Sequence, residues 1–266
     1  MLFARPYAAV LVSLLISVPL GAQQASPPPI SATTLLQRSL AAQIGNTQIS
    51  DVTLTGTARR IAGSDDETGT VTLKALVSGE VREDFSFPSG QWNEIRANSE
   101  NGPVGQSRGP DGALHATAYH NLQVESPWFF PALLLRKLSS SQGLLLASDT
   151  EPRDELTVEH LILSKQFSGP HLPENAAKLM QHASQVEVFL DPATLLPTAI
   201  SFNTHPDRDA SRDIPVEIRF SDYRLVNGVR VPFRIQKFIN NGLVLDLQME
   251  SVAFNTGLSA SSFNLQ

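Results

Sequence analysis

Apolar and polar residues alternate regularly over residues 214–254, near the C-terminus. Val229 and Val231 would lie on one face of an extended segment, while Arg230 would lie on the other. Such alternation is typical of an antiparallel sheet with one buried face and one solvated face. Two Asn-Gly pairs interrupt the pattern and favour tight hairpin turns. These pairs are Asn227-Gly228 and Asn241-Gly242.

Similar alternation predicts strands along much of the remaining chain. The segments are 51–60, 70–77, 81–87, 155–167 and a strand–turn–strand over 186–203. Residues 98–113 are rich in glycine and polar residues and predict loops, with room for one short strand. The acidic stretch 149–155 reads as a solvated turn.

Three segments have the spacing of helices. One begins at Ser31 or Thr33 and ends at Gly45, another spans 127–139, and the third spans 173–184. The order of elements predicts an α+β protein. We expect about ten strands in one strongly twisted antiparallel sheet, with the helices covering its apolar face.

The N-terminus has the pattern of an export signal. Arg5 precedes a short apolar run, and small residues before Gln23 suit a cleavage site. The run is short for a membrane span, although an uncleaved anchor is the alternative. We therefore expect a signal peptide over 1–22, a flexible tether over 23–30, a single domain over 31–266, and no transmembrane segment after cleavage.

Composition narrows the possible chemistry. The chain has no cysteine, which excludes disulfides, thiol catalysis and cysteine-bound metals. The formal charge is −6 and no basic stripe is present, so nucleic acid is not expected as a partner.

Several motifs resemble the LolA/LolB-like superfamily of outer-membrane lipoprotein carriers and their periplasmic relatives. They include the segments TTLLQRSLAAQIG, ISDVTLTGTA and VEVFLDPATLLPTAI. The most specific is a C-terminal run in which a Tyr precedes Gly-Val-x-Val-Pro, a strand and Val-x-x-Asn. The resemblance implies a curved sheet, an incomplete β-barrel with helices on its concave face, and a periplasmic location.

In the carriers, a cavity between sheet and helices holds the acyl chains of a lipoprotein in transit. By resemblance, the partner here would be a lipid or an acylated protein, bound by a soluble non-enzymatic protein without a cofactor. We expected the helix of residues 127–139 to shift when the cavity opens. The candidate cavity residues are Trp128, Phe129, Phe130, Leu134, Phe220, Phe233, Leu245 and Leu247. Alternatively, these side chains only pack against the helices.

The sequence leaves two other functions open. The fold could serve as a protein–protein or envelope-sensing module without a ligand, in which case an envelope protein would be the partner. The second alternative is a hydrolase, because GQSRG around Ser107 matches the motif G-x-S-x-G. A nucleophile elbow requires a helix directly after the serine, however, and turn residues follow here. The six histidines lack metal-ligand spacing, so we expected scattered surface histidines and no metal site.

Overall fold

The computed structural model describes residues 30–124, 127–153 and 155–264. Within these ranges it contains thirteen strands, three α-helices and two short 3₁₀ helices. The strands are β1 (Asp51–Ala62), β2 (Asp65–Leu76), β3 (Val81–Phe87), β4 (Gly90–Ser99), β5 (Gly102–Arg108), β6 (Leu114–Ala116), β7 (Leu144–Arg153), β8 (Leu156–Lys165), β9 (Val186–Leu190), β10 (Pro197–Thr204), β11 (Ile214–Val226), β12 (Val229–Ile239) and β13 (Gly242–Phe254). The helices are α1 (Ala32–Ile44), α2 (Pro131–Ser139), α3 (Glu174–Ala183), η1 (Tyr119–Gln123) and η2 (Ala260–Phe263).

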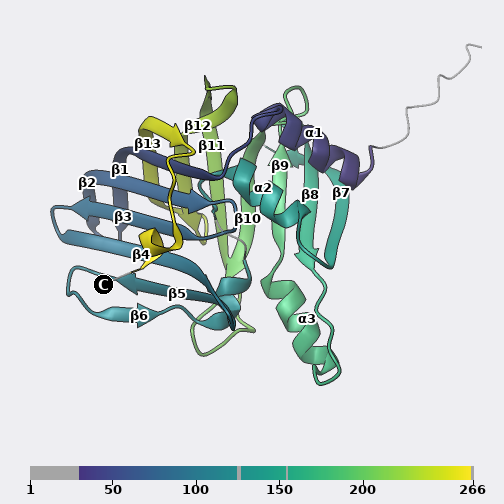
Figure 1. Cartoon of the computed structure of the whole chain (residues 1–266), viewed down its shortest axis with the longest axis horizontal. Coiled ribbons are helices and arrows are strands. Elements are labelled where there is room, and N and C mark those ends of the chain that lie inside the picture. Colours follow the sequence, from purple (N-terminus) through teal and green to yellow (C-terminus); the bar gives the residue numbers. More distant parts are fainter. Residues whose placement is uncertain (1–29, 125–126, 154, 265–266) are drawn as a thin grey trace, which may run out of the picture.

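All thirteen described strands belong to one antiparallel sheet (Figure 1). The order is β6-β5-β4-β3-β2-β1-β13-β12-β11-β10-β9-β8-β7, so strands that are adjacent in the sheet are consecutive in the sequence, except for β1 and β13. The sheet does not close, because β6 and β7 remain at its two ends. The antiparallel sheet is confirmed, but its strand count exceeds the ten or so that we predicted.

The additional strands lie where the sequence pattern was weakest. β4, β5 and β6 carry polar residues on both faces, and β7 includes residues 149–153 of the acidic stretch read as a turn. Despite this composition, each of these four strands pairs along its length with neighbouring strands of the sheet. Backbone hydrogen bonding along a sheet can therefore extend over segments whose side chains do not alternate.

The helices begin and end where local chemistry favours it. Ser31 caps α1 by accepting a hydrogen bond from the Thr34 backbone N–H at 3.3 Å, and Gly45 ends the helix with φ of 52°. α2 begins at Pro131 rather than at residue 127, because proline suits the first helical turn. The preceding residues 127–130 form a turn that is buried with it.

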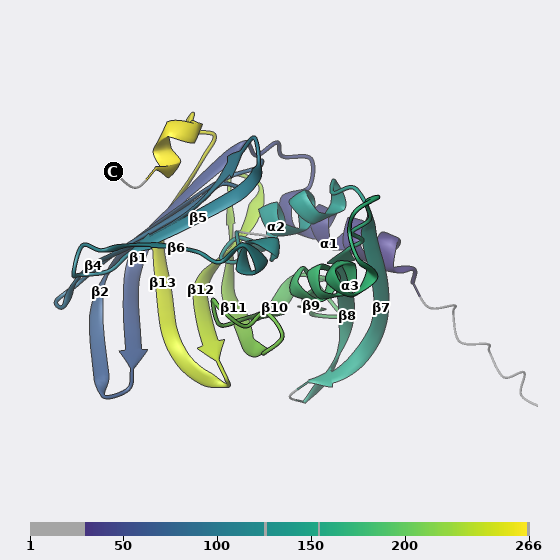
Figure 2. The same ribbon diagram turned by 90° about the horizontal axis from the view of Figure 1, so that it is seen from below.

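The core lies on the inner side of the curved sheet (Figure 2). α1 contacts β7, β8 and β12, and α2 packs against α1. Leu35 of α1 and Leu134 of α2 are fully buried, as are Leu54 of β1 and Val231 of β12. α3 contacts β8 and η1, whereas η2 contacts β3 and β4. The helices therefore fill one part of the concave side.

The two C-terminal hairpins differ in detail. The first turn is Asn227-Gly228, with φ of 48° and 83°, as expected for a tight turn. In the second, Asn240 and Asn241 take the positive φ angles, and Gly242 is already the first residue of β13. The predicted hairpin is present, but its turn lies one residue earlier than we expected.

The predicted signal peptide and residues 23–29 of the tether lie outside the described ranges. No helix among the described residues is long and apolar enough to span a membrane. Two histidines that we expected at the surface are buried: His160 is 6% exposed and His205 is 3% exposed.

Candidate ligand-binding cavity

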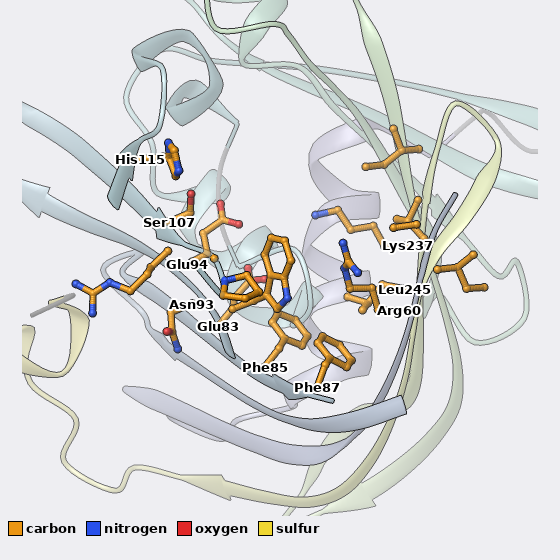
Figure 3. A pocket seen from close by; sticks show the side chains of 18 of the residues that line it. Arg60, Glu83, Phe85, Phe87, Asn93, Glu94, Ser107, His115, Lys237 and Leu245 are labelled. Atoms are coloured by element: carbon orange, nitrogen blue, oxygen red, sulfur yellow. The ribbon is translucent and has the colours of Figure 1, made fainter. Parts of the chain in front are cut away.

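An open cavity of about 880 Å³ lies between two parts of the curved sheet (Figure 3). Strands β3 to β6 form one wall, and β12 and β13 form the opposite wall. The tip of the β1–β2 hairpin, residues 60–63, contributes to its rim. The cavity thus lies beside the helices, whereas we expected it between the sheet and the helices.

A row of polar side chains crosses one wall of the cavity. Glu83 of β3 pairs with Glu94 of β4, Glu94 pairs with Ser107 of β5, and Ser107 pairs with His115 of β6. Residues directly opposite each other in an antiparallel sheet lie on the same face. The four side chains therefore share the face that lines the cavity.

Aromatic and aliphatic groups form the rest of the lining. The rings of Phe85 and Phe87 stack at 5.9 Å between centroids, and Trp92 is the cross-strand partner of Phe85. Leu245 lies on the opposite wall. The Arg60 guanidinium lies 4.6 Å from the centroid of the Trp92 ring, so a cation covers part of this aromatic surface.

The indole Nε1 of Trp92 is buried and has no hydrogen-bond partner among the described residues. Buried donors normally find a partner, so this N–H is an exception to the usual rule.

Glu83 is the electrostatic centre of the polar row. Its side chain accepts a hydrogen bond from Trp128 Nε1 at 2.7 Å, and the residue is 5% exposed. Burial and, to a lesser extent, the neighbouring Glu94 carboxylate raise the pKa of Glu83 to about 8, against the opposing effects of Lys237 and the Trp128 hydrogen bond. At neutral pH Glu83 is therefore mostly protonated.

Lys237 faces this row from the opposite wall (Figure 3). Its Nζ lies 4.8 Å from the centroid of the Trp128 ring. Register explains the orientation, because Lys237 of β12 pairs with Leu245 of β13, which also lines the cavity. An ammonium group thus stands close to a protonated carboxyl group and a second carboxylate.

A second, smaller cavity of about 310 Å³ adjoins the first. The two share Glu83, Glu94, Lys237 and Ile239, so the charged residues lie where they meet. Trp128 and residues of the η1 segment line the smaller cavity. A long ligand could therefore extend from the open cavity past the polar row.

The structure divides the predicted cavity residues into two groups. Leu245 lines the larger cavity and Trp128 lines the smaller one. The other six lie in the packed core, at most 6% exposed: Phe129, Phe130, Leu134, Phe220, Phe233 and Leu247. A role of any of the eight in binding a ligand remains a prediction.

Sequence reasoning missed the charged members of the site, although a signal was present. Glu83 falls in phase with Val81 and Phe85, and Lys237 falls in phase with Ile235 and Ile239. A charged residue on the apolar phase of a strand is costly to bury and is therefore a marker for a functional position.

Ser107 lies on the cavity wall but lacks the setting of a nucleophile elbow. Residues 109–112 after β5 form a turn that leads into β6, whereas an elbow requires a helix directly after the serine. Within the described residues no side-chain hydrogen bond joins Ser107 to His115. The GQSRG string is therefore part of a strand and the turn after it.

No protein-family model matches this sequence, and no curated protein matches it. Two crystal structures are similar in fold. A DUF1329 family protein from Desulfovibrio piger ATCC 29098 has a TM-score of 0.54 at 10% identity, covering 86% of this chain and 94% of that chain. A LolA superfamily protein from Nitrosomonas europaea has a TM-score of 0.54 at 12% identity, covering 89% and 99%. The fold of this chain is thus LolA-like, as the motifs predicted.

Proposed function

We propose that this chain is an exported, periplasmic binding protein that holds a lipid or acyl chain in the cavity between β3–β6 and β12–β13. The supporting observation is the open cavity of about 880 Å³ with apolar walls and a buried polar row. Ligand cavities in proteins typically measure about 300–1,000 Å³ and combine apolar walls with a few polar groups. The protein acts by binding and is not an enzyme.

The apolar walls provide the free energy of binding. Burying one CH₂ group gains about 0.8 kcal/mol, so six methylene groups gain about 5 kcal/mol before the cost of ordering the ligand. Phe85, Phe87, Trp92 and Leu245 offer the surface for this contact. No covalent chemistry is required.

The polar row orients the ligand. Lys237 offers a positive charge to an acidic head group, and protonated Glu83 offers a hydrogen-bond donor. An amphipathic ligand would therefore place its polar group near the junction of the two cavities and its hydrocarbon chain along the aromatic wall.

The test is a titration with a fluorescent fatty acid, together with mass spectrometry of lipids that copurify with the protein. Leu245→Gln places an amide on the apolar wall and should weaken binding about tenfold or more, because burying an unpaired polar group costs about 1–3 kcal/mol. Leu225→Gln is the matched control, since Leu225 is 64% exposed and lies outside both cavities. It should leave the affinity unchanged.

The proposal fails if no lipid copurifies and the fluorescent fatty acid does not bind. Capture of one stoichiometric envelope protein would then support the alternative, a protein-interaction module. Labelling of Ser107 by a serine-directed fluorophosphonate would support the hydrolase.

A further inference from the structure

Three side chains of the kinds that bind metal ions lie close together near α3, and they come from separate parts of the chain. His182 lies in the last turn of α3, His205 follows β10, and Asp213 precedes β11. Asp213 Oδ1 lies 2.8 Å from His182 Nε2 and 3.1 Å from His205 Nε2. One atom from each residue lies within 4.8 Å of the others.

This geometry is close to that of a metal site. A tetrahedral zinc ion binds histidine nitrogen at about 2.0–2.1 Å and carboxylate oxygen at about 2.0–2.2 Å. Such bond lengths place neighbouring ligand atoms roughly 3.3–3.5 Å apart. The two spacings around Asp213 Oδ1, 2.8 and 3.1 Å, are shorter than this by roughly 0.2–0.7 Å, so the three side chains would move slightly apart around an ion. Both imidazoles direct the same nitrogen, Nε2, toward one carboxylate oxygen.

Burial makes the site closed on one side and open on the other. The His205 side chain is completely buried, whereas those of His182 and Asp213 are 43% and 44% exposed. The partly exposed His182 and Asp213 therefore lie between the buried His205 and solvent.

The backbone of His205 is held firmly in place by Asn121 of η1. Asn121 Oδ1 accepts a hydrogen bond from the His205 backbone N–H at 2.8 Å, and Asn121 Nδ2 donates to the His205 carbonyl at 2.8 Å. Thr204 Oγ1 donates to the same Asn121 oxygen at 3.1 Å. The buried ligand is thus positioned before any ion arrives.

The second nitrogen of His205 is also informative. Its Nδ1 is buried without a hydrogen-bond partner in the part of the chain that the structure describes. The specific contacts of this side chain are concentrated at Nε2, where Asp213 and His182 converge.

We propose that His182, His205 and Asp213 form a binding site for a divalent transition-metal ion of the zinc class. Two imidazoles and one carboxylate are a typical ligand set for zinc, and the exposed side leaves a fourth position to water. The bound ion would join the end of α3 to the β10–β11 connection beside η1. Because η1 also borders the smaller cavity, the ion would stiffen that wall.

Calorimetric titration of the untagged, chelator-treated protein with ZnCl₂ tests this proposal. We expect one Zn²⁺ per chain and a higher Tm that EDTA reverses. His182→Gln and Asp213→Asn should each weaken Zn²⁺ binding at least about 10–100-fold, the loss seen even for outer-shell partners of metal sites. His171→Gln, at an exposed histidine outside the cluster, should bind Zn²⁺ like the original protein.

His182 is the preferred position to change, because it is partly exposed and its replacement leaves the buried His205 in place. Co²⁺ gives an independent readout, since its visible absorption reports nitrogen and oxygen ligands directly. The proposal is overturned if the original protein binds less than one Zn²⁺ per chain, or if His182→Gln and Asp213→Asn bind Zn²⁺ as tightly as the original. Neither outcome depends on whether the cavity binds a lipid.

Discussion

The carboxyl group of Glu83 is buried where a negative charge is costly. It lies against the Trp128 indole and opposite the Glu94 carboxylate. Its pKa of about 8 in the folded protein is far above the ordinary value of 4.5. The unfolded chain therefore releases this proton at a much lower pH than the folded chain does, which makes Glu83 a source of pH-dependent stability.

Replacing Glu83 with glutamine should remove this dependence. The stability that Glu83 provides is fully present below pH 4.5 and is lost as the pH rises toward 8, because the folded pKa is the higher one. The free energy of unfolding of the original protein relative to Glu83→Gln should fall by about 3–5 kcal/mol over this range. Urea denaturation at several pH values measures it. Parallel pH profiles for the two proteins would contradict the assignment.

The motif residues of the C-terminal run have structural roles at the same scale. Asn255 takes a φ of 57°, and its Oδ1 accepts a hydrogen bond from the Ser50 backbone N–H at 2.8 Å. Its Nδ2 donates to the Gln48 carbonyl at 2.9 Å. Tyr223 donates from its hydroxyl to the Pro197 carbonyl at 2.8 Å. These residues identify the fold because they connect its elements, and they say little about a ligand.

At the level of elements, helix α2 is deeply buried, which does not suit a helix that moves to admit a ligand. Leu133, Leu134, Leu135 and Leu138 are at most 1% exposed, and the helix packs against α1. We had expected this helix to move when a ligand enters. The larger cavity instead opens between strands, so we now expect entry without displacement of α2.

Leu134→Ala tests this view. Removing a fully buried leucine side chain should lower the free energy of unfolding by about 2–5 kcal/mol, measured by denaturant titration. The affinity of the folded variant for the fluorescent fatty acid should stay within about threefold, because Leu134 does not line either cavity. A much larger loss of affinity would show that α2 takes part in binding.

The alternation of apolar and polar residues predicted the strands that have one buried face, and it missed strands that line the cavity. β1, β2 and β12 have one apolar face because helices or other strands cover them. β4 and β5 instead bear Glu94 and Ser107 on the face that lines the cavity, so the apolar phase is lost. The weak alternation of these strands and the presence of the cavity thus have the same origin.

At the scale of the whole molecule, the sheet is held more weakly at its β6 end than at its centre. β6 has three exposed residues and pairs only with β5 among the described strands, whereas β1 pairs along most of its length with both β2 and β13. Backbone amides at a sheet end open more easily than those in its centre.

Hydrogen exchange followed by mass spectrometry should reveal this gradient. Peptides from β1, β2, β12 and β13 should exchange most slowly, and the peptide containing β6 should exchange fastest among the strands. Addition of a bound fatty acid should slow exchange in β3 to β5, which line the larger cavity. Uniform protection across the sheet would contradict the expected order of stability.

The cluster of His182, His205 and Asp213 could not be foreseen from spacing. Its members come from the ends of three elements, and metal motifs recognised in sequences place ligands on one helix or one loop. Only the path of the chain brings these ends together. The sequence does place Glu83 and Lys237 on the apolar faces of their strands. It does not show which residues on those faces line a cavity, because that depends on where the helices pack.

The pairing of β1 with β13 has a consequence for how the protein is made. These neighbours are separated by most of the chain, and Asp51 at the start of β1 accepts hydrogen bonds from Thr256 and Gly257 just after β13. The centre of the sheet can therefore form only after the last strand has left the ribosome. Contacts between such distant segments slow folding. Under the proposed export, synthesis and passage through a membrane channel precede folding. A chain truncated before residue 242 would leave the edges of β1 and β12 unpaired and prone to aggregation.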